Sequence, residues 1–150
     1  MSQKLFPVFD VPGALAENVA TQRKYLPAPL WDAEAGDFVY NGARQPMYGS
    51  GYDAWVLWCI KTIQTQRWAC HGYGSGAGVE AEEAFAEPDR ASTESSFERT
   101  ITEALLADPM GRTRIVQEFA FEWRSDSLHI SCVVIGDDGN SATIDTDIKN

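Results

Sequence analysis

Apolar and polar residues alternate with a period of two in the last third of the chain. The alternation covers residues 115–124, where one face would carry Ile115, Gln117, Phe119, Phe121 and Trp123. It resumes over residues 128–134, after a turn at residues 124–127 that is rich in serine and charged residues. Because successive side chains of a strand point to opposite faces, the two segments predict a pair of antiparallel strands.

A third alternating segment follows at residues 142–148, after a Gly-Asp-Asp-Gly-Asn loop. Thr143, Asp145 and Asp147 would share one face of this strand, and Ile144, Thr146 and Ile148 the other. The segment is apolar on one side only. Together the three segments predict a three-stranded antiparallel meander.

Helical periodicity marks residues 54–67. Trp55, Cys59 and Ile63 lie four residues apart, as one face of a helix requires, and the first half of the segment is apolar on every side. Asp53 is the N-cap candidate, since it follows a glycine-rich turn. We expect this to be the central buried helix.

A second helix is predicted before residue 108. Ser95 and Glu98 have the spacing of a capping box, and Asp108-Pro109 would end the helix. Its apolar face would contain Phe97, Ile101, Ala104 and Leu105.

The first fifty residues have a different character. Four prolines before residue 30 favour an extended arm, which would pack either on its own domain or on another subunit. Asn41-Gly42 between short apolar segments predicts a small β-ribbon. We therefore expect an arm over residues 1–30 and an α+β domain over residues 31–150, in which ribbon and helices accompany the meander and the helices cover one of its faces.

Composition limits the classes of partner. The chain has 150 residues, 44% of them hydrophobic, and a net charge of −10, as expected for one acidic globular domain. Binding to nucleic acid or to an anionic membrane surface would need a clustered basic surface, so both are disfavoured. The longest apolar run, Ala54–Ile60, is too short to span a membrane. Three cysteines without close pairing indicate reduced thiols and a cytoplasmic site of synthesis.

A long loop over residues 67–90 contains the first candidate for chemistry. Gly72, Gly74 and Ala77 fit a relaxed dinucleotide-binding pattern, but that pattern should follow a strand and open a helix. Here it follows a helix and leads into a run of glutamates that would repel phosphate. We expect a flexible hinge and no nucleotide cofactor.

Cysteine and histidine residues offer a second candidate, in Cys59, Cys70, His71, His129 and Cys132. A structural zinc site needs closely spaced ligand pairs, and the chain has none, so we expect buried thiols and no metal. Cys70 with His129 stays open as a nucleophile and base, although alternation directs Cys132 inward and His129 outward.

Carboxylate pairs suitable for glycoside hydrolysis do not stand out either. Glu118 and Glu122 would lie on a solvated sheet face. No catalytic residue is predicted.

The last strand suggests recognition through a sheet edge. Its place at the end of the meander allows unpaired backbone groups, which could bind a partner strand by β-augmentation. The alternative is a capped, inert edge, for which Asp145 and Asp147 supply suitable charges.

Several stretches between residues 30 and 148 resemble a known family. They are Gly36-Asp37-Phe38 to Asn41-Gly42, Asp53-Ala54-Trp55 to Arg67-Trp68, Gly72-Tyr73-Gly74, Phe97-Glu98-Arg99 to Asp108-Pro109, and Phe119–Glu122 to Leu128–Ser131. The chain resembles the sheath initiators of contractile tails, a phage baseplate-wedge family with members long labelled lysozyme-like. The resemblance covers phage tails, tailocins and other contractile injection systems alike.

This resemblance implies a structural role. Six copies would surround the tail axis, and the C-terminal sheet would accept strands from the terminal arms of the sheath protein and so template the first sheath ring. The sheath-binding positions would be Phe119, Phe121, Trp123, Leu128, Ile130, Thr143, Ile144, Asp145 and Ile148.

The resemblance also implies contacts within the baseplate. Some members have a Glu-Pro-Arg contact to wedge proteins, and this chain has Glu87-Pro88-Asp89-Arg90 with an additional aspartate, which makes Glu87, Pro88 and Arg90 the candidates. Tube or hub proteins are further candidate partners. The protein would be a monomer in the host bacterial cytoplasm before it joins the particle. A peptidoglycan-degrading lysozyme-like enzyme and a cytoplasmic adaptor of the same fold are the alternatives.

Overall fold

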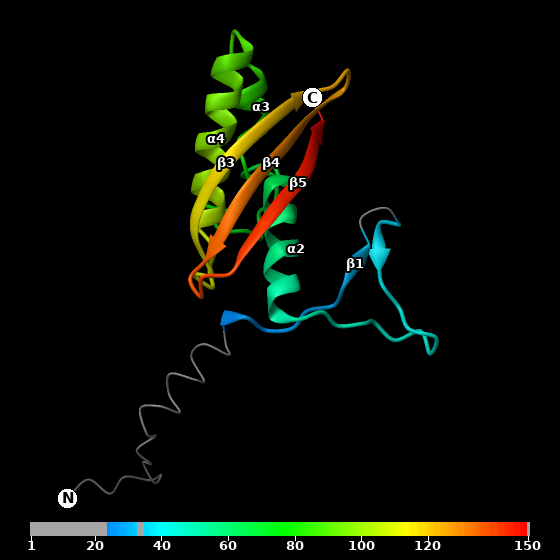
Figure 1. The fold of residues 1–150 in the computed structure, drawn as a ribbon. Coiled ribbons are helices and arrows are strands. Elements are labelled where there is room, and N and C mark those ends of the chain that lie inside the picture. The colour runs from blue at the N-terminus through cyan, green and yellow to red at the C-terminus, as the bar shows by residue number, and fades with distance from the viewer. Residues whose placement is uncertain (1–23, 33–34, 150) are drawn as a thin grey trace, which may run out of the picture.

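Three long strands form the antiparallel meander that the alternation predicts. The computed structural model describes residues 24–32 and 35–149, so most of the proposed arm over residues 1–30 lies outside the described residues. The strands are β3 (Thr113–Trp123), β4 (Ser127–Gly136) and β5 (Ser141–Lys149), in the order β3-β4-β5 (Figure 1).

The helices lie together on one face of this sheet (Figure 1). Helix α4 (Arg90–Leu106) packs against β3, and α2 (Gly51–Ile63) packs against β5. A short helix that the sequence analysis did not predict, α3 (Ala81–Phe85), packs against α4. The α+β class is thereby confirmed.

The core lies between the helices and the sheet. Every second residue of β4 and β5 is buried, because these side chains point toward the helices. The predicted stripe of α2 and the apolar face of α4 meet them there. The fully buried large side chains include Trp55, Cys59, Ile63, Phe97, Ile101, Leu105, Leu128, Ile130, Val134 and Ile144.

A buried ion pair between Asp108 and Arg112 directly follows α4. Asp108 accepts hydrogen bonds from the Arg112 side chain at 2.8 and 3.1 Å, and from the backbone N–H groups of Met110 and Arg112. The Arg112 guanidinium also lies 5.4 Å from the ring of Trp58. The carboxylate is therefore buried with its acceptors occupied, as a buried charge requires.

Strand β3 departs from the predicted alternation at a β-bulge. One extra residue lies between Gln117 and Ala120 relative to the register of β4, and Glu118 adopts a φ of 56°. After the bulge Phe119 faces the helices, whereas Ile115, before it, is 42% exposed. The expectation that Ile115 and Gln117 share the face of Phe119 is wrong for this reason.

Both long helices begin earlier than predicted. The N-cap of α2 is Ser50, and Asp53 closes the capping box from the third helical position; hydrogen bonds from the Ser50 side chain and backbone lower the pKa of Asp53. Asp89 caps α4 by accepting from the backbone N–H of Ser92 at 2.9 Å, which replaces the predicted box at Ser95. Helix α2 also ends at Ile63, before residue 67.

The predicted ribbon is present but is built differently. Strands β1 (Trp31–Asp32) and β2 (Asp37–Phe38) pair antiparallel, and the ribbon extends from the body of the molecule on the β5 side (Figure 1). Asn41 accepts from the backbone N–H groups of residues 43 and 45, and Arg44, not Gly42, has the positive φ. The Asn41 turn therefore does not join β1 to β2; it follows β2, lies inside the bridge between Tyr40 and Pro46, and is wider than a two-residue Asn-Gly hairpin.

The loop after α2 is attached at both ends of its glycine-rich part. Gln66 and Val79 form a parallel bridge, and Val79 is fully buried. Gly78 permits this bridge, since a Cβ there would lie 2.5 Å from the carbonyl oxygen of Thr65. Arg67 pairs with Glu80 at 2.8 Å. The expected flexible hinge is therefore a loop whose C-terminal end belongs to the core.

Candidate functional site

The sheet has two edges, and β5 forms one of them, as the sequence analysis proposed. Strand β4 pairs with β3 along one side and with β5 along the other. Among the described residues no further strand pairs with β3 or β5. Each edge therefore presents backbone N–H and C=O groups that another chain could pair with.

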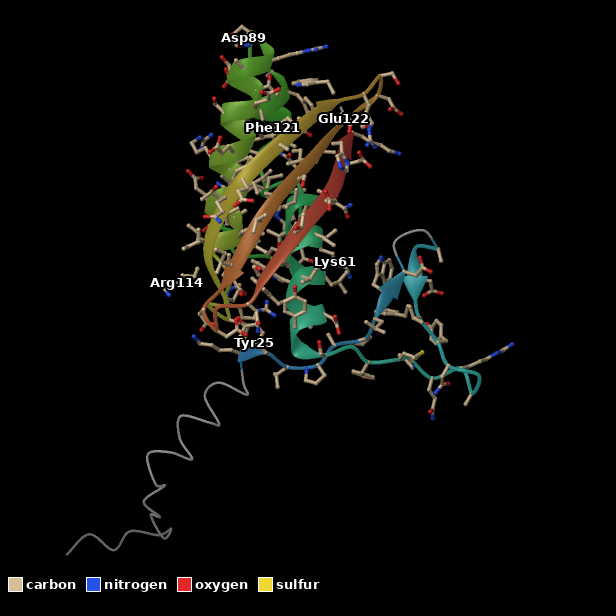
Figure 2. All side chains as sticks on the ribbon, viewed as in Figure 1. Tyr25, Lys61, Asp89, Arg114, Phe121 and Glu122 are labelled. Carbon is tan, nitrogen blue, oxygen red and sulfur yellow. The ribbon has the colours of Figure 1, made fainter. Side chains whose placement is uncertain are left out.

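Most of the predicted sheath-binding side chains point away from these edges and into the molecule. Leu128, Ile130, Ile144 and Ile148 are buried in the core. Phe119, Phe121 and Trp123 are half-buried on the face toward α4, and Figure 2 shows Phe121 beside that helix. Thr143 and Asp145 alone among the nine are exposed. Contact by the buried positions would therefore involve their backbone groups.

The helix side of the β3 edge is covered by side chains near its C-terminal end. The indole N–H of Trp123 donates to Glu94 of α4 at 2.8 Å, and the Arg90 guanidinium lies 5.1 Å from the same ring. The bulge at Glu118 interrupts the strand between these contacts and its N-terminal half.

The edge at β5 is bordered by two pockets. The first has a volume of about 280 Å³ and lies between the start of β5, α2 and the segment before β1. Apolar groups predominate in its walls, which include Leu30, Val56, Leu57, Ile60 and Ala142.

The second pocket lies at the other end of the same strand. Its volume is about 640 Å³, and it is enclosed by the end of α2, by α3 and by the last residues of β5. Ile63, Val79, Phe85 and Ile148 supply its apolar part. The helix side of β5 is thus open at both ends of the strand, unlike that of β3.

The outer face of the sheet is charged near the C-terminal half of β5. Asp147 accepts from His129 and from Arg124, both at 3.0 Å. Asp145 is more loosely held, with its nearest cation candidate, His129 Nε2, at 3.8 Å and its own side chain 57% exposed. Glu122 pairs with Arg124 at 3.4 Å. Two exposed aspartates therefore lie on this face of the edge strand, with Lys149 at its end.

The candidate baseplate contact lies where α4 begins, at the end of the molecule at which β3 and β5 end (Figure 2). Glu87 and Pro88 in the turn between α3 and α4, and Arg90, the first residue of α4, are all exposed. Asp89 is the N-cap of α4, which gives a structural reason for the additional aspartate.

None of the candidate chemistries is assembled. Burial raises the pKa of Cys59 to about 12 and that of Cys132 to about 11, so both thiols are protonated core residues. Cys70 is exposed in the loop after α2, whereas His129 is on the outer face of the sheet with Asp147. Within residues 24–32 and 35–149 no group of three His, Cys, Asp or Glu side chains could hold a metal ion.

The described end of the expected arm packs on its own domain through Tyr25, one of the arm residues expected to dock, although its partners could not be predicted. The Tyr25 hydroxyl donates to Asp137 in the β4–β5 turn at 2.8 Å, and its ring meets Trp55 edge-on at 6.1 Å (Figure 2). Lys24 also pairs with Asp137. Gly51 is required beside them, since a Cβ there would overlap the Tyr25 carbonyl group. The sequence signal for this contact was limited to an aromatic residue close to two prolines.

The fold and site define a class: a small α+β protein whose three-stranded sheet is covered by helices on one face and has an edge strand that no further described strand pairs with. A family comparison identifies the class more closely. Residues 29–139 match the contractile injection system sheath initiator family, and the chain belongs to that family. It is thus a structural component of a contractile injection system, with the sheath protein as its partner.

Two further findings complete the comparison. No curated protein matches the chain in sequence. In the part of the chain that the structure describes, no helix has the length and apolarity needed to cross a membrane.

Proposed function

We propose that this protein templates the first ring of the contractile sheath by β-strand addition. A terminal arm of a sheath subunit would pair with the free edge of the C-terminal sheet, and main-chain hydrogen bonds would supply much of the affinity. The observation that carries the proposal is the β5 edge, which is nine residues long, regular in register and paired with no further described strand; of its backbone carbonyls, that of Ser141 accepts from the Tyr52 hydroxyl at 2.8 Å.

The proposal includes a place in the particle. Six copies would surround the tail axis, with Glu87, Pro88 and Arg90 directed toward wedge proteins because all three are exposed at one end of the helix layer. Tube or hub proteins would lie near the remaining surface. Assembly would take place in the host bacterial cytoplasm, from a monomer.

The experiment that tests this function removes the protein from its own gene cluster. Without it, we expect electron micrographs to show baseplates and tubes without sheath, because the first ring would have no template. Restoring the gene should restore sheathed particles, in which mass spectrometry should count about six copies beside many sheath subunits. Sheathed tails of normal length in the deletion strain would contradict the proposal.

An enzymatic role is tested separately with the purified chain. The lysozyme-like alternative predicts turnover of cell-wall peptidoglycan, which we do not expect: Glu82 and Asp147 both line the second pocket, but both side chains are exposed and Asp147 is paired with Arg124 and His129, so neither is an acid held in an apolar site. A commercial lysozyme is the positive control. An adaptor would instead form a one-to-one complex with a host protein and would be missing from purified particles.

A further inference from the structure

We propose that the β5 edge, and not the β3 edge, receives the incoming strand, and that this strand alternates apolar with basic residues. The inference rests on the proposed function, because it specifies which edge and which partner sequence that function would use. Three independent observations carry it: the two pockets beside β5, the aspartates on its outer face, and the bulge and covered helix side of β3.

The pockets determine what the helix-facing side chains of the partner should be. A strand added beside β5 points every second side chain toward the helix layer. There it would meet Leu57 and Ile60 in the first pocket, and Ile63 and Phe85 in the second. These walls are mainly apolar, so burial of apolar partner side chains would contribute favourable free energy.

The spacing of the pockets adds a positional requirement. The first borders Ala142 and Thr143, and the second borders residues 147–149. With a rise of about 3.3 Å per residue, the two are roughly 13–20 Å apart along the strand. The partner should therefore have its two largest apolar residues roughly four to six positions apart, on one face.

The outer face determines the other half of the pattern. Ser141, Thr143, Asp145, Asp147 and Lys149 alternate outward along β5, so the acidic positions are 145 and 147. Residues directly opposite on an added strand would have Cβ atoms about 4.5–5.5 Å from theirs, a distance at which opposite charges attract. Since Asp145 has only a 3.8 Å contact to His129, a lysine or arginine of the partner could pair with it.

The segment before β1 forms a second wall for the same partner. Pro29, Leu30 and Trp31 line the first pocket opposite β5. The Lys61 ammonium lies 4.6 Å from the Trp31 ring, and Figure 2 shows Lys61 on the side of α2 toward β1. This contact holds the wall beside α2, so the strand would enter a groove with two sides.

The test uses labelled nine-residue peptides and the full chain. One peptide alternates lysine and valine, a second contains the same five lysines and four valines in paired order, and a third alternates glutamate and valine. Fluorescence anisotropy should show the alternating basic peptide binding at least about tenfold more tightly than either of the others, a difference of about 1.4 kcal/mol. Equal binding of the two basic peptides would overturn the sequence pattern.

Matched variants test the edge. Leu57→Gln changes the first pocket outside the buried core, and Asp145→Lys reverses the charge of the outer face. Each should weaken binding of the alternating basic peptide by about fivefold or more. Leu106→Gln and Glu98→Lys make the same changes at exposed positions of α4 and should leave the affinity unchanged. Circular dichroism establishes that all four variants fold.

Particle assembly then separates the two proposals. If deletion of the gene abolishes the sheath but Leu57→Gln and Asp145→Lys assemble normally, the assignment to β5 fails and the template function stands. If sheath forms without the gene, the template function fails whatever the peptides show. Loss of sheath in Leu57→Gln and in Asp145→Lys, with normal assembly of the two α4 controls, supports both proposals.

Discussion

At the scale of single residues, two of the three cysteines are buried core residues and not reactive thiols. The side chain of Cys59 points from α2 into the core between the helices and the sheet, and that of Cys132 points from β4 into the same core. Their pKa values of about 12 and about 11 result first from burial, which disfavours the charged thiolate. Cys70 differs because it is exposed in the loop after α2.

This difference predicts one reactive thiol in the folded protein. At pH 8, below both raised pKa values, Cys59 and Cys132 stay protonated and shielded, so a maleimide or disulfide reagent should modify Cys70 alone. Intact mass spectrometry should record one adduct on the native chain and three after unfolding in guanidinium chloride. Cys70→Ser should abolish the fast reaction; rapid double modification of the native protein would contradict the burial described above.

At the scale of elements, sequence periodicity predicted the helices and the meander, but not the helix starts, the bulge in β3 or the pockets. The stripe of α2, the apolar face of α4 and the alternation of β4 and β5 follow from burial against one common core, which is a local property of the sequence. Helix starts were missed because Ser50 and Asp89 compete with other capping residues nearby, and only the tertiary path of the chain decides among them. Each pocket is lined by segments that are far apart in the sequence, so no local sequence pattern predicts it.

The bulge in β3 is the most instructive miss. Alternation of residue types over residues 115–124 looks unbroken, yet one residue is extra relative to β4. The pairing partner, which the segment itself does not specify, determines which side chains face the core. Glu118 takes the positive φ that the bulge needs, although glycine would adopt it with less strain.

A pair of substitutions at Glu118 tests this description. Glu118→Gly should raise the free energy of unfolding by up to about 1 kcal/mol, because relief of the left-handed backbone exceeds the added entropy of the unfolded chain. Glu118→Val should lower it, since a β-branched residue is disfavoured at positive φ. Urea unfolding measures both. The opposite order of stability would show that residue 118 is ordinary extended strand.

At the scale of the whole molecule, the layers separate two kinds of surface. One face of the sheet is covered by α2 and α4, and the other is open, with its charged groups toward the C-terminal half of β5. The ribbon extends on the β5 side and exposes Phe38, Tyr40, Met47 and Tyr48. The proposed groove is therefore the place where the β5 edge, α2 and the segment leading into the ribbon come together.

Net charge gives the last prediction. The chain carries −10, and the proposed partner strand is basic, so long-range attraction should accelerate their encounter. Raising sodium chloride from about 20 mM to about 500 mM shortens the screening length severalfold and should weaken binding of the alternating lysine–valine peptide mainly through a slower association rate. Stopped-flow fluorescence separates the two rates. Dissociation should change less, because backbone pairing and pocket burial do not depend on distant charges. An affinity independent of salt would leave the apolar groove as the whole basis of recognition and would remove the acidic face from the proposal.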